Sequence, residues 1–116
     1  MFNRSINKPA IALAALMLLG GTGSALAYSC EGEFAKADAL IKEAEGDIKP
    51  DTDARIKAML AEAKGTLEAA KISHRQASEK HVGAMGKYMH GDAVRKGRWA
   101  QSLASEVIFL ATGQPR

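Results

Sequence analysis

The sequence predicts an all-helical protein, an antiparallel up-down bundle of four helices that follows a signal peptide. Apolar residues recur every three or four positions over most of residues 34–111, which is the period of one face of an α-helix. The period-two alternation that marks β-strands is missing, and so are the Asn-Gly and Asp-Gly turns of β-hairpins. The pattern therefore favours helices packed on one another over any fold that contains a sheet.

The first 27 residues have the three parts of a secretory signal peptide. A basic start without acids precedes the unbroken apolar run Ala10–Leu19, and Ala25-Leu26-Ala27 is a small-x-small cleavage site. The apolar run is about half as long as the ~20 residues that a membrane-spanning helix needs. We expect residues 1–27 to be removed and residues 28–116 to form one domain in the bacterial periplasm, without a transmembrane segment.

Cys30 is the only cysteine, so no intramolecular disulfide can stabilise this small exported domain. The thiol could form an intermolecular bridge, carry a lipid anchor or have no special role. Ala27-Tyr28-Ser29 lacks the leucine expected three positions before a lipidated cysteine, and Tyr28 is bulky for such a site. The sequence favours an unmodified thiol over a lipoprotein.

The first two helices are predicted from their apolar spacing and from their ends. One helix face is formed by apolar residues at positions 34, 37, 41, 44 and 48. Lys49-Pro50 ends this helix, because the residue before a proline is pushed out of the helical region. Asp51, Thr52 and Asp53 can cap the next helix, whose apolar face continues through positions 56, 60, 63, 67 and 70.

Two interpretations remain open for the middle of the chain. Ser73 or Ser78 can cap a third helix that ends at Gly91, with Asp92 capping a fourth that ends before Gly113. Alternatively, one long helix spans residues 53–90, which gives three helices with a long central one. We favour four helices, because four short helices bury a core better than three unequal ones.

The predicted core is rich in alanine, because alanine occupies many of the apolar positions in every predicted helix. Its large apolar side chains are expected to be Phe34, Trp99 and Phe109. Such a core allows helices to approach closely but buries little apolar area per residue.

The charges and motifs exclude several classes of function. The net charge of +3 is due mostly to the basic leader, and the rest has an excess of acids before residue 70 and of bases after it. These halves attract each other and form no dense basic stripe, so we predict no nucleic-acid binding. No nucleophile-and-base motif, phosphate-binding glycine loop or metalloprotease motif occurs, so we predict no enzyme.

Three segments carry a resemblance to a known family: AEAKGTLEAAK (61–71), HVGAMGKYMHGDAVRKG (81–97) and WAQSLASEVIFL (99–110). They resemble the bacterial small metal-binding protein, a periplasmic four-helix bundle of alanine-rich, charged helices. The resemblance covers most of the chain after the leader. It implies a helical bundle that binds divalent metals, copper among them, through histidines. That family has many histidines along its helices, whereas this chain has three.

The segment HVGAMGKYMHG (81–91) indicates one metal site. At a spacing of four residues, His81, Met85 and Met89 turn by only about 40° from one to the next and share a helix stripe. Imidazole and thioether groups together suit copper(I). We therefore predict copper binding by these three residues. The alternative is that the methionines fill the core and the histidines are solvated.

Other ligands can complete such a site from neighbouring helices. Met59 and Cys30 are candidates for a facing ligand. His74 and His90 are secondary candidates. On one continuous helix His74 lies about 10 Å from His81, which is too far to share an ion unless the chain bends between them.

The function predicted from the sequence is a small periplasmic metal-binding protein, such as a copper buffer or carrier. The alternative is a non-enzymatic interaction module. Four basic residues surround Trp99, an arrangement that suits an acidic protein partner or an anionic membrane surface: Lys87, Arg95, Lys96 and Arg98.

Overall fold

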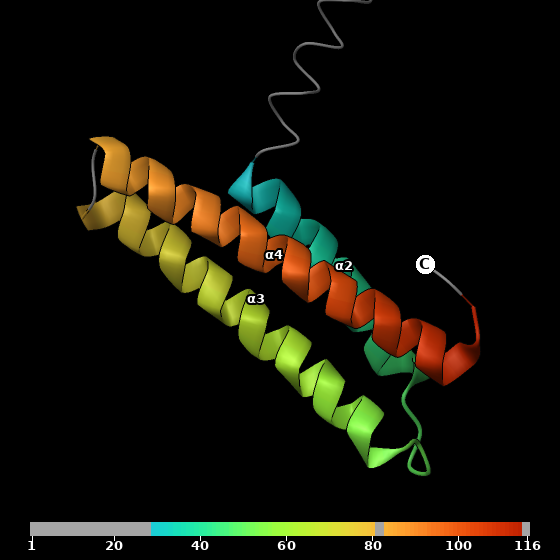
Figure 1. Cartoon of the computed structure of the whole chain (residues 1–116). Coiled ribbons are helices and arrows are strands. Elements are labelled where there is room, and N and C mark those ends of the chain that lie inside the picture. The colour runs from blue at the N-terminus through green and yellow to red at the C-terminus, as the bar shows by residue number, and fades with distance from the viewer. Residues whose placement is uncertain (1–28, 81–82, 115–116) are drawn as a thin grey trace, which may run out of the picture.

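The computed structural model describes residues 29–80 and 83–114, which contain three helices and no strand. The helices are α2 (Cys30–Asp47), α3 (Ala54–Lys80) and α4 (Gly83–Thr112). Consecutive helices run in opposite directions (Figure 1), so the predicted all-helical antiparallel class is confirmed. None of the helices in these ranges combines the length and apolar character needed to cross a membrane. The predicted signal peptide and His81 lie outside the described residues.

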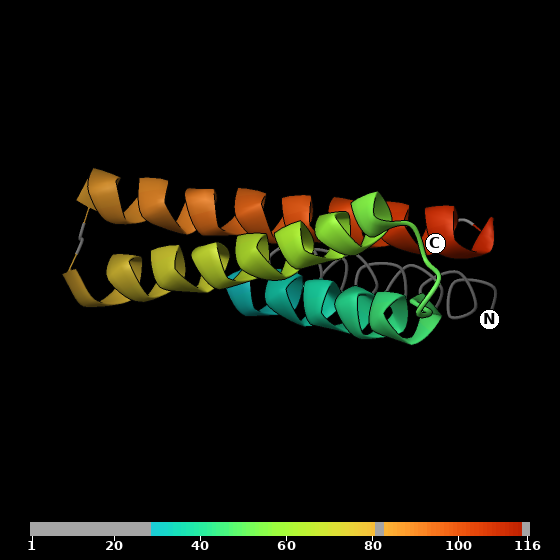
Figure 2. The same ribbon diagram turned by 90° about the horizontal axis from the view of Figure 1, so that it is seen from below.

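The helices form a long hairpin with a shorter third helix against it. α3 and α4 pack side by side, and α2 lies against one half of this hairpin, mainly against α4 (Figures 1 and 2). The last turns of α3 and the first turns of α4 extend beyond the start of α2. The described chain therefore has a three-helix part and a two-helix end, and α2 begins where they meet.

The helix ends follow the local chemistry of the sequence. The Ser29 side chain accepts a hydrogen bond from the Gly32 N–H at 3.3 Å and caps α2. The Asp53 carboxylate accepts one from the Arg55 N–H at 2.8 Å, as expected for the start of α3. Gly83 and Gly113 bound α4 with φ of +64° and +75°, a region that residues with a Cβ enter at a cost of about 1 kcal/mol or more.

The predicted helix break between Ser73 and Ser78 is wrong, because α3 is continuous there. Neither serine caps a new helix. The Ser73 hydroxyl is buried and donates to the Asp92 carboxylate on α4 at 2.9 Å. The Ser78 hydroxyl donates to the backbone oxygen of His74 at 3.0 Å, inside the same helix.

The predicted boundary at Gly91 and Asp92 is also wrong, since α4 runs through both residues. Asp92 does not cap a helix. Its carboxylate accepts from Ser73 and pairs with Lys96 at 2.7 Å, so the residue joins α4 to α3. The four-helix version therefore fails. The three-helix alternative has the right number of helices, but its central helix ends at Lys80 and not at residue 90.

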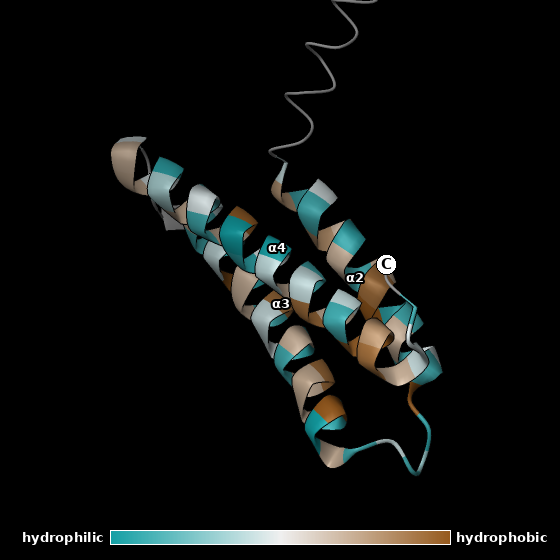
Figure 3. Ribbon diagram, turned by 45° about the vertical axis from the view of Figure 1, so that its right-hand side comes forward, coloured by the Kyte–Doolittle hydropathy of each residue, from teal (hydrophilic) through white to brown (hydrophobic). Residues whose placement is uncertain are grey.

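The core is light, as predicted, and consists largely of alanine with a few branched side chains. Figure 3 shows hydrophilic and hydrophobic residues alternating in short bands along each helix, as expected for helices with one buried side. Phe34 is buried, as predicted, whereas Trp99 and Phe109 are 56% and 49% exposed. Ile108 and Val107 are instead the largest fully buried side chains among the described residues.

The closest packing between α2 and α4 occurs at Gly97. A Cβ atom placed there would lie 3.3 Å from the Glu33 Cβ and 3.4 Å from the Phe34 Cδ1. The glycine therefore allows the two helices to approach beside the first turns of α2. A leucine at this position would push the helices apart.

We predict that Gly97→Leu lowers the free energy of unfolding by about 1–3 kcal/mol, because the larger side chain overpacks the contact between α2 and α4. Urea unfolding followed by circular dichroism measures the change. Gly65→Leu is the matched control, because a Cβ at Gly65, also within a helix, meets no atom within 4 Å. Equal loss of stability in the two variants would contradict the packing argument.

Glu33 is a buried carboxylate in this contact. The Gln101 amide donates to the Glu33 Oε2 at 3.2 Å and to the Glu33 backbone oxygen at 3.1 Å. The nitrogen atoms of Arg98 and Lys36 lie 3.6 and 3.5 Å from the Glu33 carboxylate oxygens. Burial is the largest single influence on the pKa of Glu33 and would raise it. The hydrogen bond from Gln101 and the two nearby cations together outweigh burial, so the pKa of Glu33 is below its ordinary value of 4.5.

A lowered pKa means that the ionised carboxylate stabilises the folded state. We predict that this contribution is complete above the ordinary value of 4.5 and is lost as the pH falls through the lower folded-state pKa. The difference in unfolding free energy between the wild type and Glu33→Gln should therefore be constant from about pH 7 to about pH 5. It should become smaller as the pH falls below about 5. Urea unfolding across this range tests the prediction, and a difference that stays constant down to about pH 3 would contradict it.

Candidate metal centre

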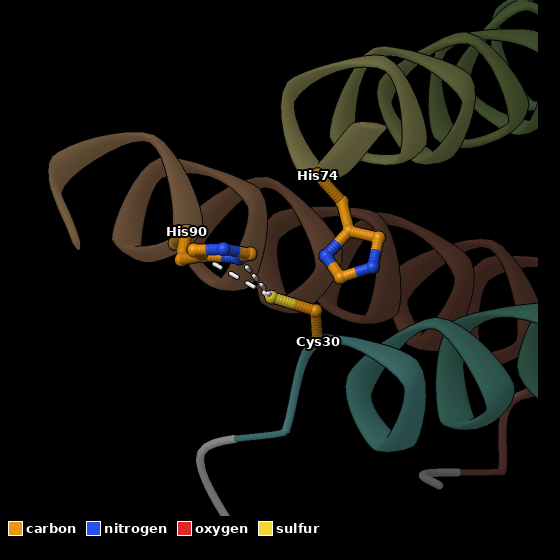
Figure 4. Close-up of side chains that lie close together, drawn as sticks. All are labelled: Cys30, His74 and His90. Carbon is orange, nitrogen blue, oxygen red and sulfur yellow. Dashed lines mark hydrogen bonds between the residues drawn. The ribbon is translucent and has the colours of Figure 1, made fainter. Parts of the chain in front are cut away.

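Cys30, His74 and His90 meet where the two-helix and three-helix parts of the structure join. Cys30 opens α2 and is 7% exposed, while His74 lies on α3 and His90 on α4, both half-buried. Figure 4 shows one side chain entering the space from each helix. One ligand atom from each residue lies within 4.8 Å of the other two. We call these residues the Cys-His-His cluster.

The shortest distances in the cluster are close to those within a metal coordination sphere. The Cys30 Sγ lies 3.8 Å from the His90 Nδ1. With metal–sulfur and metal–nitrogen bonds of about 2.3 and 2.0 Å, the two ligand atoms lie about 3.5 Å apart in a tetrahedral site and about 3.7 Å apart in a trigonal one. Cys30 and His90 therefore need almost no rearrangement to share an ion, and His74 needs a shift of about 1 Å.

His74 has an unsatisfied polar atom. Its Nδ1 is buried and has no hydrogen-bond partner within the described part of the chain. Its ring makes edge contacts with Phe34 on one helix and with His90 on another, at centroid distances of 5.8 and 5.3 Å. Burying a polar nitrogen without a partner costs about 1–3 kcal/mol. A metal ion bound by that nitrogen would remove the cost.

The Cys30 thiol is held toward His90. It lies 3.6 Å from the His90 backbone oxygen, to which it donates, as well as 3.8 Å from the ring nitrogen. Burial is the largest influence on the thiol and raises its pKa above the ordinary value of 9.0. Without a metal the thiol is therefore protonated at neutral pH, and a metal ion must displace its proton to bind the sulfur.

A surface cleft of about 340 Å³ adjoins His90. Its lining comes from α4: His90, Gly91, Val94, Arg95 and Arg98. Arg95 is 3.5 Å from Asp92 and lies over the ring of Tyr88, and Arg98 is 3.6 Å from Glu33. His90 thus belongs both to the Cys-His-His cluster and to the lining of this cleft, which has basic groups at its edge.

The structure brings together His74 and His90, which were the secondary candidates in the sequence analysis. It also places them beside Cys30, which was predicted only as a possible additional ligand. Of the predicted stripe, Met85 is 55% exposed and Met89 is half-buried beside His90, while His81 lies outside the described residues. The stripe of His81, Met85 and Met89 therefore stays a prediction. Met59 lines a different cleft, with Ile56 of α3 and Leu110 near the end of α4.

The proximity of His74 and His90 could have been predicted from the position of the turn between α3 and α4. α3 ends at Lys80 and α4 begins at Gly83, so His74 and His90 lie at similar distances on either side of the turn. In an antiparallel hairpin such residues come side by side. The four-helix interpretation ended a helix at Gly91 and so placed a turn there. With the turn at Gly91, His74 and His90 were not expected to lie side by side.

Comparison of the chain with protein-family models, with curated proteins and with solved structures finds no match in any of the three. The geometry of the cluster and the chemistry of its ligands therefore carry the functional argument.

Proposed function

We propose that this protein binds one transition-metal ion, copper in preference to others, at the Cys-His-His cluster, and acts as a copper buffer or carrier in the bacterial periplasm. The observation that carries the proposal is the convergence of three ligand atoms from three helices to within 4.8 Å of one another. The leader-like residues 1–27 support export, and the resemblance to the bacterial small metal-binding protein supports metal binding.

The ligand types select the class of metal. A thiolate is a soft ligand and imidazole a borderline one, so the cluster favours copper or zinc over magnesium or calcium, which prefer oxygen ligands. Copper(I) is bound well by low-coordinate thiolate and imidazole sites, and copper(II) exceeds zinc in general affinity for such ligands. With three protein ligands, a fourth coordination position on the ion stays open. A ligand from another molecule can bind there, which a carrier requires in order to pass on its metal.

The experiment is a titration of the purified exported protein with copper(I) in competition with a chelator, followed by copper(II), zinc and nickel in a calorimeter. We expect one equivalent of copper(I) to bind with a Kd far below micromolar, and zinc to bind more weakly. Absence of binding tighter than micromolar for all four ions would refute the proposed function.

Paired variants locate the site. His74→Ala together with His90→Ala removes two of the three residues of the cluster, whereas His81→Ala together with Met85→Leu removes two of the three residues of the stripe predicted from the sequence. We expect the first pair to abolish tight copper binding and the second to leave it in place. The reverse result would keep the metal-binding function but move the site to the stripe.

A second candidate function is supported by the exposure of two aromatic side chains on α4. Tyr88 and Trp99 are 62% and 56% exposed, and the guanidinium of Arg95 lies 5.5 Å from the centroid of the Tyr88 ring. Aromatic and basic groups on one helix suit an acidic protein partner or an anionic membrane surface. Binding to anionic vesicles that weakens with salt and is lost in Trp99→Ala would support this function, and binding to neutral vesicles of equal strength would contradict it.

A further inference from the structure

We infer that the Cys-His-His cluster holds copper in both oxidation states and that the protein can act as a one-electron carrier. This inference rests on the proposed function, because it needs copper at the cluster. It adds a reaction to that function, the reversible transfer of one electron to and from the bound ion.

The ligand set is the first argument. One cysteine thiolate and two histidine nitrogens, arranged around a trigonal position, are the main ligands of copper sites that transfer electrons. Here the Cys30 Sγ and the His90 Nδ1 are 3.8 Å apart, close to the separation of about 3.7 Å expected in a trigonal plane. The third ligand, His74, offers a buried nitrogen without a hydrogen-bond partner in the described chain. The cluster therefore offers a ligand set that can bind both copper(I) and copper(II).

The lack of a second cysteine is the next argument. Copper(II) oxidises thiols in pairs: two thiolates lose one electron each, a disulfide forms, and two copper ions are reduced. Cys30 is the only cysteine of the chain and is 7% exposed, so it has no partner within the protein and little access to another molecule. A copper(II) thiolate can therefore persist here, whereas a site with two neighbouring cysteines would be consumed.

The rigidity of the ligands is the third argument. Each ligand belongs to a different helix, and the helices are joined close to the cluster by the Ser73–Asp92–Lys96 hydrogen bonds and by the packing of Gly97 on Phe34. Phe34 and His90 contact the His74 ring on two sides. Such packing keeps the ligands in place while the charge on the ion changes, which lowers the structural cost of electron transfer.

The electron balance is simple. Copper(I) bound by the thiolate and two imidazoles gives one electron to a one-electron oxidant and becomes copper(II) with the same three ligands. No bond forms or breaks and no proton moves, and a one-electron reductant reverses the step. His90 lines the surface cleft, so its ring provides a path for the electron between the buried cluster and a redox partner.

The test is spectroscopic and uses ferricyanide as oxidant and ascorbate as reductant. The protein is loaded with one equivalent of copper(I) without oxygen and then oxidised. We expect a thiolate-to-copper charge-transfer band in the visible range, and an electron paramagnetic resonance spectrum distinct from that of histidine-only copper(II). Ascorbate should remove both signals, and repeated cycles should restore them without loss.

Variants assign the signals. Cys30→Ser should lose the charge-transfer band completely, and His74→Ala should shift or weaken it if the histidine is a ligand. Gln76→Ala, an exposed substitution on the same helix, should leave the band unchanged. Circular dichroism of each variant verifies that the helices are intact. A band that survives Cys30→Ser would overturn the inference.

The outcomes separate this inference from the proposed function. Tight copper(I) binding followed by release of the ion on oxidation, or by a spectrum without a thiolate band, would overturn the electron-carrier inference and leave the buffer or carrier function standing. Failure to bind copper(I) at all would overturn both. Reversible cycling with a thiolate band would support both.

Discussion

Saturation with copper(I) is expected to raise the melting temperature of this protein by roughly 15–30 °C. A ligand that binds only the folded state stabilises it by about 4 kcal/mol when its free concentration is about 1,000 times the Kd. The effect is large here because the ion would bind residues from α2, α3 and α4 at once. It would connect all three described helices in a chain that has a light core and no second cysteine for a disulfide.

Thermal unfolding followed by circular dichroism, with and without copper(I), measures the shift. Magnesium at the same concentration is the control and should have no effect, because the cluster has no oxygen ligands among its side chains. The double variant His74→Ala and His90→Ala should show no shift with copper(I). A shift in that variant as large as in the wild type would contradict stabilisation through the cluster.

Replacement of Cys30 by serine is expected to weaken copper(I) binding by about 1,000-fold, equivalent to about 4 kcal/mol. Loss of a group that only orients a ligand typically costs about 10–100-fold in metal affinity, so loss of the one soft ligand should cost more. Serine keeps the size of the side chain but has no thiolate, and it leaves copper(I) with two imidazoles.

Competition with a chelator measures this change in Kd. Ser29→Ala is the matched control, because it removes the cap at the start of α2 but no ligand. It should lower the free energy of unfolding by about 1 kcal/mol and leave the copper Kd nearly unchanged. A change of less than about tenfold in Cys30→Ser would show that the thiol is not a ligand.

Several features of this protein follow from the sequence because they depend on neighbours in the chain. The apolar period defines the helices, and Pro50, Asp53 and Gly113 mark their ends through effects that reach only a few residues. The alanine-rich positions of the period define the buried faces, including Ala37, Ala63 and Ala104. Which metals suit imidazole and thiolate groups is likewise a property of the residue types themselves.

The contacts between helices decided the rest. Ser73 and Asp92 both have strong local tendencies to cap helices, yet they bond to each other across the hairpin, which satisfies both and removes both predicted helix ends. Gly83, with positive φ, bounds α4 at the end of the hairpin where the chain reverses, and Gly91 lies inside the helix. Trp99 is exposed, although Gly97 and Gln101 on the same helix contact α2.

The Cys-His-His cluster is the clearest case of a feature that only the tertiary structure decided. Spacing within one helix favoured His81, Met85 and Met89, because a single helix can define only the contacts between side chains three or four residues apart. Cys30, His74 and His90 are far apart in the chain, and their approach depends on where the hairpin turns and on which face of it α2 covers. The residue types could be read from the sequence, whereas their convergence into one cluster required the packing of three helices.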